Sequence, residues 1–360
     1  MNRRMIRMEH PEATAKIFGS FDRNATMIEE QFGVTVRNRA GDAGDSIVIE
    51  GENADEVNAA AQCVSYLHGL CSKTDVLSEQ SVQYAIDMVR AGQGSELEEL
   101  GDACICITAK GKPIKAKTVG QKQYVDRIQK NTIVLGVGPA GTGKTFLAVA
   151  MAVRALREKQ ISRIILTRPA IEAGEKLGFL PGDLQSKIDP YLRPLYDALY
   201  ELLGMENYQR LVEKGVIEIA PLAYMRGRTL DDSFIILDEA QNATPEQMKM
   251  FLTRLGFHAK AVVTGDLTQT DLPNGQKSGL SAAVKILAGI DDIGIHYFSE
   301  RDVVRHRLVQ QIIQAYERYD REAARRAHEQ ETKKERLRAR VARNDTERIQ
   351  RHETKRDVQN

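Results

Sequence analysis

The sequence predicts an α/β fold whose main domain is built on a parallel, doubly wound sheet. Three observations carry this prediction. An apolar run at 132–137 leads into a glycine-rich turn, and a helical pattern follows at 146–157. Further short apolar runs then alternate with helical stretches, which is typical of a parallel sheet covered by helices. Each run also ends in polar residues, and ligands of such sheets lie at the carboxyl ends of the strands.

The turn after the first run fits the phosphate-binding pattern G-x-x-x-x-G-K-[ST] at every position. Its glycines let backbone N–H groups turn toward a phosphate, and the helix N-terminus adds partial positive charge. The lysine of the pattern reaches the β- and γ-phosphate oxygens. A strand and a helix flank the turn in register, so a chance glycine-rich turn is the weaker interpretation. The loop predicts binding of a nucleoside triphosphate by Gly138, Pro139, Ala140, Gly141, Thr142, Gly143, Lys144 and Thr145.

A second acidic element follows the apolar run Ser233 to Leu237, which is typical of a strand buried on both faces. This run ends in Asp238 and Glu239. Beside the phosphate loop, Asp238 would hold Mg²⁺ together with the Thr145 hydroxyl. Glu239 would orient and deprotonate an attacking water. Two solvated acids at a strand end are the alternative, and the presence of the loop favours the catalytic interpretation.

Besides a last strand at 293–298, the other strands predicted in this domain are 164–166, 216–219 and 261–263. Between the last two runs, Thr244 with Gln247 predicts a capped helix that continues through Leu255 and stops at Gly256. Because the carboxyl ends of parallel strands meet at one edge, five polar residues should lie together there. They are Thr167, Arg168, Asp238, Thr264 and Gln269.

Five motifs, at 138–145, 167–182, 224–229, 238–242 and 264–269, together resemble the PhoH family of phosphate-starvation-inducible-type ATPases over residues 121–318. The resemblance implies one RecA-like motor domain of helicase superfamily 1 type, which hydrolyses ATP with Mg²⁺. It also implies γ-phosphate sensing by Gly265 to Gln269 and adenine recognition by Gln123. Arg301 and Arg305 match the C-terminal arginine motif of the family. One departure is Arg307, where the family often has a proline.

Residues 1–75 are predicted to form a separate α+β unit. A strand at 14–18, a helix at 23–32, strands at 34–39 and 46–50 and a helix at 54–70 resemble the KH-like domain of PhoH-like ATPases. A KH loop that binds RNA needs G-x-x-G between two helices. The nearest candidate runs from Gly19 to Asp22, with aspartate in place of the second glycine. RNA clamping and a docking or assembly role therefore both stay open.

Residues 76–120 are predicted to form a connector with a lysine-rich hairpin between 105 and 117. Its lysines could attract nucleic acid without regard to sequence, and the alternative is a sheet edge that lysine protects from aggregation. Arginines in the motifs could bind phosphates and stack on bases, and structural salt bridges are the alternative there. The candidate RNA-contact residues are Lys112, Lys115, Lys117, Arg168, Arg226 and Arg228.

Residues 319–360 are predicted to be a charged tail, helical or disordered, which continues one long helix from about Val303. Residues 321–360 hold 13 Lys and Arg against 8 Asp and Glu, although the whole chain is nearly neutral at 51 against 50. A solvated segment and an RNA-touching tail both fit this composition. The four cysteines lack metal-site spacing, so we expect them to be reduced. Without an 18-residue apolar run or a leader, a cytoplasmic protein with no membrane segment is expected.

These features predict an ATP-hydrolysing, RNA-linked motor or helicase-type remodeller. The resemblance implies a role in ribosomal RNA processing beside an endoribonuclease. The alternative is a slow, ATP-gated scaffold that recruits the nuclease without unwinding RNA, and a kinase is a third class. Since the chain shows one motor domain, no second motor domain supplies an arginine to the γ-phosphate, and a neighbouring subunit could supply it instead. This predicts a homo-oligomer, with a hexameric ring favoured, in which Arg301 or Arg305 acts in trans; action in cis is the alternative.

Overall fold

The computed structural model describes residues 1–8, 11–40, 45–71, 77–100, 103–169, 184–273 and 275–304, with nine residues between 308 and 325. The side chains of 184–191 and of a few further residues lie outside this description. Two compact units are present, residues 1–304 and residues 305–360. Most of the motif predicted at 167–182 lies outside the described residues, from 170 onward.

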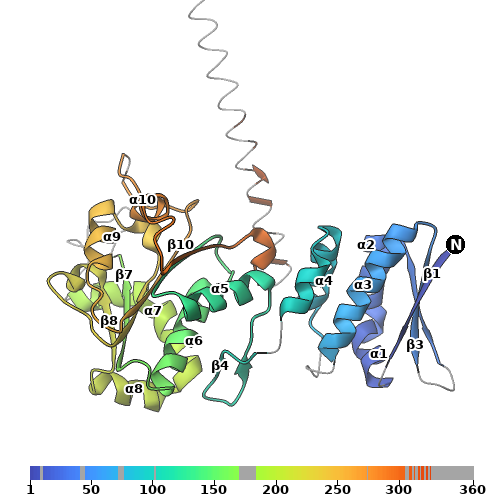
Figure 1. The fold of residues 1–360 in the computed structure, drawn as a ribbon, viewed down its shortest axis with the longest axis horizontal. Coiled ribbons are helices and arrows are strands. Elements are labelled where there is room, and N and C mark those ends of the chain that lie inside the picture. The colour runs from blue at the N-terminus through green and yellow to red at the C-terminus, as the bar shows by residue number, and fades with distance from the viewer. Residues whose placement is uncertain are drawn as a thin grey trace, which may run out of the picture. The chain divides into compact units, whose positions relative to one another are not determined.

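A six-stranded sheet forms the centre of the predicted nucleotide-binding region (Figure 1). Its strand order is β11-β6-β10-β9-β7-β8, and every neighbouring pair is parallel. The predicted doubly wound α/β fold is therefore confirmed. The strands are β6 Ile133–Val137, β7 Arg163–Arg168, β8 Ile217–Pro221, β9 Ser233–Leu237, β10 Lys260–Gly265 and β11 Ile293–Tyr297.

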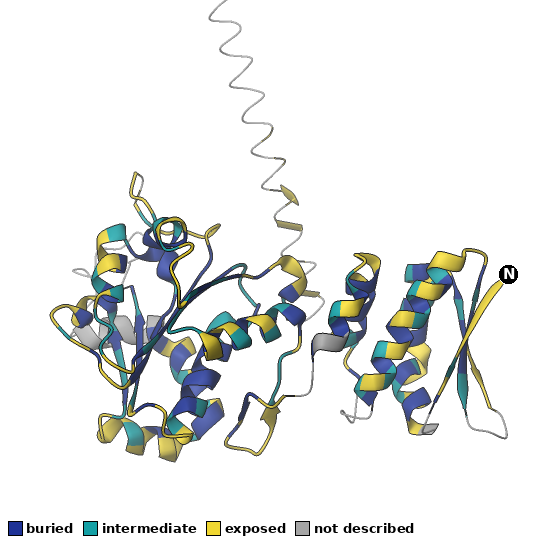
Figure 2. Ribbon diagram, viewed as in Figure 1, coloured by how far each residue is buried: buried dark blue, intermediate teal, exposed yellow. Residues whose placement is uncertain are grey.

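Helices cover both faces of this sheet, because side chains alternate between the faces along each strand. In β9, Phe234 and Ile236 belong to one apolar cluster, whereas Ile235 and Leu237 belong to another. All five β9 residues are buried, as Figure 2 shows for the centre of the sheet. The first cluster includes α5 Val119–Lys130, α6 Lys144–Arg157, α7 Leu184–Leu203 and α8 Met205–Glu213; the second includes α9 Pro245–Leu252 and α10 Gly279–Ile286.

Helix α9 begins as predicted and ends earlier than predicted. Thr244 and Gln247 form a complete capping box, with proline at the start of the helix. The helix stops at Leu252 rather than Leu255. Leu255 instead forms an isolated β-bridge with Leu230, and the Gly256 backbone N–H donates to the Leu230 carbonyl at 3.1 Å. The predicted stop at Gly256 is therefore wrong.

The N-terminal region contains a three-stranded antiparallel sheet, order β1-β3-β2, with helices on one face. The strand predicted at 14–18 is wrong, since this segment is helical. Ala13, Thr14 and Ile17 are buried together, which matches one face of a helix and not the alternation of a strand. The elements are β1 Asn2–Arg7, α1 Pro11–Phe18, α2 Arg23–Phe32, β2 Thr35–Arg39, β3 Ser46–Gly51 and α3 Ala54–Cys71. Residues 19–22 thus lie between two helices.

The segment between these regions holds helix α4 Glu79–Arg90, the 3-10 helix η2 Gly94–Leu100 and the predicted hairpin. The hairpin strands, β4 Cys106–Ile107 and β5 Pro113–Ile114, pair antiparallel. Helix α4 contacts the start of α5, where the backbone N–H of Val119 donates to the Tyr84 hydroxyl at 2.8 Å. Sequence patterns did not predict α4.

After residue 304, the nine described residues between 308 and 325 are helical. The predicted helix does not start at Val303, because Val303 and Val304 lie outside any helix. In the described part of the chain, Cys63, Cys71 and Cys106 are buried and free. Burial raises the pKa of Cys63 to about 12, which keeps this thiol protonated. No helix of the described residues is long and apolar enough to cross a membrane.

His296 on β11 is a buried titratable side chain beside Tyr124 and Phe298. Burial, with the positive charge of Arg127 as a smaller cause, lowers the pKa of His296 to about 4. The unfolded chain binds this proton near pH 6.5, so the contribution of His296 to stability is complete above that pH. It is lost as the pH falls from 6.5 toward 4.

We therefore expect the wild-type protein to lose about 2 kcal/mol more unfolding free energy than His296→Phe between pH 7 and pH 5. Phenylalanine keeps a neutral ring at this position and removes the titration. Urea unfolding of both proteins at the two pH values measures the difference. Equal losses in the two proteins would contradict the buried, neutral state of His296.

Candidate active site

The predicted phosphate loop connects β6 to α6, and glycine is required at several of its positions. Gly138, Gly141 and Gly143 all have positive φ, at 151°, 87° and 80°. A Cβ at Gly138 would lie 2.7 Å from both the Cβ and the carbonyl oxygen of Phe298. The Lys144 ammonium donates to the carbonyls of Gly138 at 2.6 Å and Pro139 at 2.8 Å. The Lys144 side chain thus folds back onto its own loop, where its positive charge can contact a bound phosphate.

A glutamine on α5, Gln121, supports the loop, whereas the adenine recognition expected of Gln123 stays a prediction. Gln121 is buried, and its Nε2 donates to the Thr142 carbonyl at 3.0 Å. Its Oε1 accepts the backbone N–H of Lys117 at 2.7 Å. Gln123 is exposed, and its side chain makes no hydrogen bond among the described residues. Helical spacing could have found Gln121, because it precedes the buried Tyr124 by three residues.

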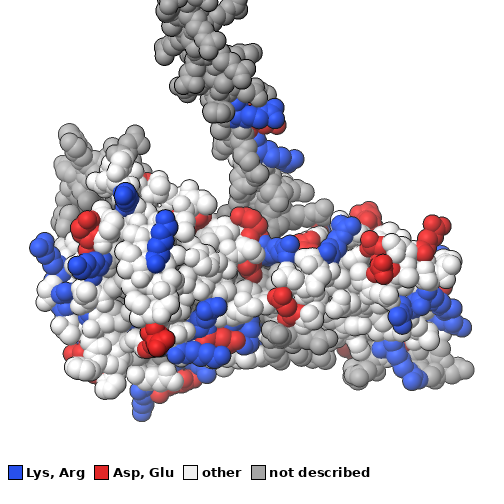
Figure 3. Space-filling view, turned by 45° about the horizontal axis from the view of Figure 1, so that its top comes forward, with Lys and Arg blue, Asp and Glu red and all other residues white. Residues whose placement is uncertain are grey.

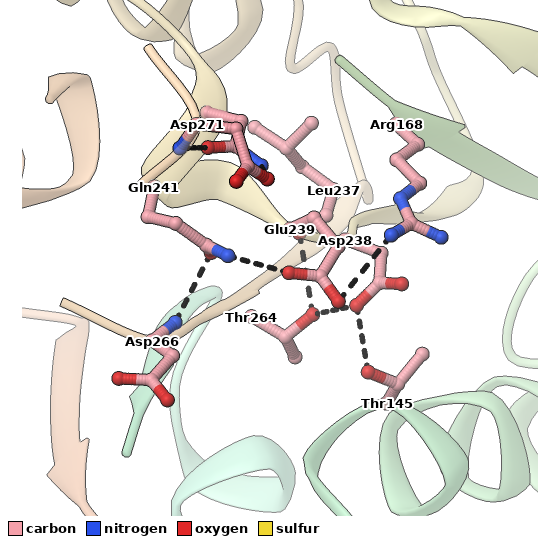
Figure 4. Close-up of polar contacts among 10 residues, drawn as sticks. Thr145, Arg168, Leu237, Asp238, Glu239, Gln241, Thr264, Asp266 and Asp271 are labelled. Atoms are coloured by element: carbon pink, nitrogen blue, oxygen red, sulfur yellow. Dashed lines mark hydrogen bonds and ion pairs between the residues drawn. The ribbon is translucent and has the colours of Figure 1, made fainter. Parts of the chain in front are cut away.

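Asp238 lies at the carboxyl end of β9, and hydroxyl groups from two other elements point toward it (Figure 4). Its Oδ1 accepts the Thr145 hydroxyl at 2.6 Å and the Thr264 hydroxyl at 2.7 Å. Carboxylate and hydroxyl oxygens are the ligands that Mg²⁺ prefers. Asp238 and Thr145 therefore fit the magnesium-binding role that the sequence predicted.

Glu239 follows in the left-handed region of φ and ψ, at 51° and 41°. This conformation costs a non-glycine residue about 1–3 kcal/mol and is characteristic of functional sites. Its carboxylate accepts the amide of Gln241 at 2.5 Å and lies 3.4 Å from the Arg168 guanidinium. Arg168, predicted to contact RNA, is thus an ion-pair partner of the candidate general base (Figure 4).

Gln241 connects Glu239 to the predicted γ-phosphate-sensing segment, a role that sequence patterns did not predict. It is only 2% exposed, and its Oε1 accepts the backbone N–H of Asp266 at 3.1 Å. A Cβ at Gly265 would lie 2.6 Å from this oxygen, so the glycine leaves room for the glutamine. Asn242 and Asp271 form a second link between the chain after Glu239 and the loop after β10. The Asn242 side-chain amide donates to the Asp271 carboxylate at 3.1 Å, and the Asp271 backbone N–H donates to Asn242 Oδ1 at 2.8 Å.

Four of the five polar residues expected at one sheet edge come together there. The Asp238 backbone N–H donates to the Thr167 carbonyl at 2.9 Å, and the contacts of Thr264 and Arg168 complete the group. Gln269 is exposed on the loop after β10, and its side chain makes no hydrogen bond within the described ranges. The predicted contact of Gln269 with the γ-phosphate stays a prediction.

The C-terminal arginine motif lies against the phosphate loop. The backbone N–H of Val304 donates to the Gly141 carbonyl at 2.9 Å. Asp302 is buried, and its carboxylate accepts the hydroxyl of Thr118, the N-cap of α5, at 2.7 Å. The exposed Arg301 guanidinium donates to Gln93 Oε1 at 2.6 Å. Arg305 lies outside the described residues.

The candidate RNA-contact residues differ in their surroundings. Arg228 binds both carboxylate oxygens of Glu218, at 2.5 and 2.7 Å, which matches the salt-bridge alternative. Arg226 is exposed, and so are Lys112 and Lys117 of the hairpin region. Lys115 is partly buried. The pair Arg226 and Arg228 is thus divided between one exposed and one ion-paired side chain.

Comparison with known proteins places this site in a family. The model of the PhoH-like protein family matches residues 113–317. A PhoH-like protein of Bacillus subtilis (strain 168) is 50% identical over 312 residues, which cover 87% of this chain and 96% of that protein. A PhoH-like protein of Mycobacterium tuberculosis (strain H37Rv) is 53% identical over 310 residues, 86% of each chain.

Two further likenesses are more limited. Protein PhoH of Escherichia coli (strain K12) is 48% identical over 206 residues, 57% of this chain and 58% of that protein. The solved SWI2/SNF2 ATPase core of Sulfolobus solfataricus in complex with dsDNA is 15% identical, with a TM-score of 0.29 over 51% of this chain and 33% of that one, too slight a likeness to inform function. The family match and the long, half-identical alignments are decisive: the chain belongs to the PhoH family, with the phosphate-binding loop and the parallel α/β fold of a P-loop ATPase.

Proposed function

We propose that the protein hydrolyses ATP in the presence of Mg²⁺ and uses the reaction to act on RNA as a motor or remodeller. The observation that supports hydrolysis best is the placement of Glu239. Glu239 is the residue after Asp238, which accepts the Thr145 hydroxyl, and its carboxylate is held by Gln241 and Arg168. A carboxylate held in this way can position a water and take its proton.

Binding of the triphosphate rests on the loop and on Lys144. Backbone N–H groups of the loop and the α6 N-terminus would surround the phosphates, and Lys144 would exchange its contacts with loop carbonyls for phosphate oxygens. Thr145 and Asp238 would hold Mg²⁺, which neutralises the charge of the triphosphate when it is bound. Glu239 then accepts a proton from the attacking water, and Arg168 stabilises the carboxylate until that transfer.

A response to the γ-phosphate would pass through Gln241. This side chain bonds Glu239 with its amide nitrogen and the Asp266 backbone with its oxygen. A shift of the segment that begins at Asp266 would therefore change the orientation of the general base. The arrangement supports coupling between the presence of the γ-phosphate and the position of Glu239.

RNA as the substrate is implied by the sequence resemblance stated above and is supported by exposed basic side chains. Lys112, Lys117 and Arg226 are exposed, and the first two adjoin the β4–β5 hairpin. The proposal includes a homo-oligomer, with a hexameric ring favoured, and an endoribonuclease of ribosomal RNA processing as a partner. The alternative is an ATP-gated scaffold that recruits the nuclease without unwinding RNA.

The test is the rate of ATP hydrolysis with and without structured RNA, together with the native mass. For an RNA-linked motor we expect single-stranded or structured RNA to raise the rate by about tenfold or more, equivalent to about 1.4 kcal/mol of barrier. The Lys144→Ala variant serves as the background control, and an unwinding assay on a short RNA duplex separates a motor from a scaffold. Hydrolysis that RNA leaves unchanged would favour the scaffold.

A further inference from the structure

Among the described residues, helices cover one face of the N-terminal sheet and none covers the other face. Val36 of β2 and Ile47 and Ile49 of β3 are buried in the core formed with α1, α2 and α3. Side chains alternate along a strand, so the residues between these point to the opposite, outer face. In the strand register, the outer rows read Arg3–Glu50–Thr35, Met5–Val48–Arg37 and Arg7–Ser46–Arg39 across β1, β3 and β2.

Arginines dominate this outer face. Arg3, Arg7, Arg37 and Arg39 are all exposed, and the strands bring one acid to the same face, Glu50, which lies 3.4 Å from Arg3. Figure 3 shows Lys and Arg side chains at the lower right of the view, in the region of this sheet, with Asp and Glu side chains above them. The face thus carries four positive charges and one negative charge.

The contrast with the inner face is clearest for Arg37 and Arg39. Arg4 alternates to the helix side of β1, where its Nε donates to Asn58 of α3 at 2.8 Å. On the outer face, Arg37 and Arg39 make no side-chain hydrogen bond or ion pair with any described residue. Protection of the edge strands from aggregation would explain charged side chains here. It does not require that they be arginines or that they lie on one face of the sheet.

The chemistry of the face fits the backbone of a nucleic acid. Guanidinium groups bind phosphate oxygens through two parallel hydrogen bonds and are weakly hydrated, which makes arginine better suited than lysine to this contact. Neighbouring strands are about 4.8 Å apart, so arginines on β1 and β2 lie about 10 Å apart across β3. A single-stranded nucleic acid lying across the sheet could contact several of these arginines at once.

The centre of the face is apolar without being aromatic. Met5 is 62% exposed, and Val48 beside it on β3 is 5% exposed although it belongs to none of the three core clusters. The exposed Met5 side chain can contact a sugar or a base face, whereas Val48 offers almost no surface. The lack of an aromatic side chain in these outer rows removes the usual stacking platform. Recognition here would therefore depend on phosphates and not on base sequence.

We propose that this outer face binds the phosphate backbone of single-stranded RNA, through Arg3, Arg7, Arg37 and Arg39. The inference rests on the proposed RNA-linked function and assigns it an RNA-binding surface. This surface is distinct from the loop at 19–22 and from the lysine-rich hairpin. It lies outside the nucleotide site, so binding here needs no change in Lys144 or Glu239.

The test is the salt dependence of binding to a labelled oligouridylate, measured by fluorescence anisotropy between about 0.05 and 0.5 M KCl. Arg37→Ala combined with Arg39→Ala should lower the log–log slope by about 1.4, since each phosphate contact with a single strand contributes about 0.7. At about 0.1 M salt, the Kd should rise by about 25-fold and then converge toward wild type near 1 M. Glu50→Gln should tighten binding, because it removes the acid from the face.

Two controls separate this surface from general effects. Arg210→Ala with Lys214→Ala removes the same charge from the exposed surface of α8 and should leave the slope unchanged. The variant Arg37→Lys with Arg39→Lys keeps both positive charges and should retain most of the slope. Loss of the slope in this variant as well would indicate that the substitutions disturb the structure of the sheet. An unchanged slope in the alanine variant, with RNA still bound by wild type, would overturn the face and leave the proposed function intact. Failure of wild type to bind RNA with or without ATP would overturn both.

Discussion

Glu239→Gln is expected to lower ATP turnover by about 10²–10⁴-fold while ATP binding is retained. Glutamine has nearly the same shape and can still hydrogen-bond Gln241, but it cannot take a proton from water. Lys144→Ala should instead lose both binding and hydrolysis, because the cation over the loop carbonyls is removed. Equilibrium titration with a fluorescent ATP analogue and single-turnover hydrolysis distinguish the two variants.

Glu246→Gln is the matched control for this experiment, because it removes an exposed carboxylate from the start of α9 without touching the site. Its turnover should equal that of wild type. If Glu239→Gln also hydrolysed ATP at close to the wild-type rate, another group would have to activate the water. The contacts of Glu239 with Gln241 and Arg168 would then be structural.

Loss of the arginine that meets the γ-phosphate should lower turnover by about 10³-fold or more. Arg305 is the stronger of the two candidates for action in a neighbouring subunit, because the Arg301 guanidinium already hydrogen-bonds Gln93 in its own chain. Arg305 directly follows Val304, whose backbone contacts the phosphate loop, so action at its own nucleotide remains the competing arrangement. Arg305→Ala should therefore be nearly inactive in either case.

Mixing subunits separates the two arrangements. Arg305→Ala subunits keep an intact loop, and Lys144→Ala subunits keep the arginine, so co-assembly restores complete sites only if the arginine acts in trans. We expect ATPase activity in the mixture well above that of either variant alone, measured with the native mass of the assembly. Inactive mixed oligomers, or a wild-type monomer with full activity, would exclude action in trans.

The central sheet could be predicted because its strands are buried on both faces and therefore appear as unbroken apolar runs. Phe234 to Leu237 illustrates this, and the position of Asp238 at the end of that strand follows directly. Spacing alone also placed the phosphate loop and the α9 cap, since both depend on neighbours in the sequence. These features are local, and local geometry can be inferred from a single chain.

Contacts between distant segments could not be predicted in the same way. Helical spacing can place Gln121 on the buried face of α5, but only the packing of α5 against the loop decides that it contacts Thr142. Arg228 pairs with Glu218 because β8 and the turn after it bring both side chains together. The helix at 11–18 was mistaken for a strand because its short apolar pattern is ambiguous until its partners are known.

The buried carboxylate of Asp302 has a consequence for timing within the catalytic cycle. It fastens the chain beside Val304 to the N-cap of α5, and a Cβ at Gly120 would lie only 2.3 Å from its Oδ1, so the two segments have no room to slide. If a bound triphosphate shifts the loop at Gly141, the Val304 contact, the α5 N-cap and the Val119–Tyr84 bond with α4 should respond in the same step. Amide hydrogen exchange should then slow at Val119 and Val304 together on ATP binding, because nucleotide binding would stabilise both contacts at once.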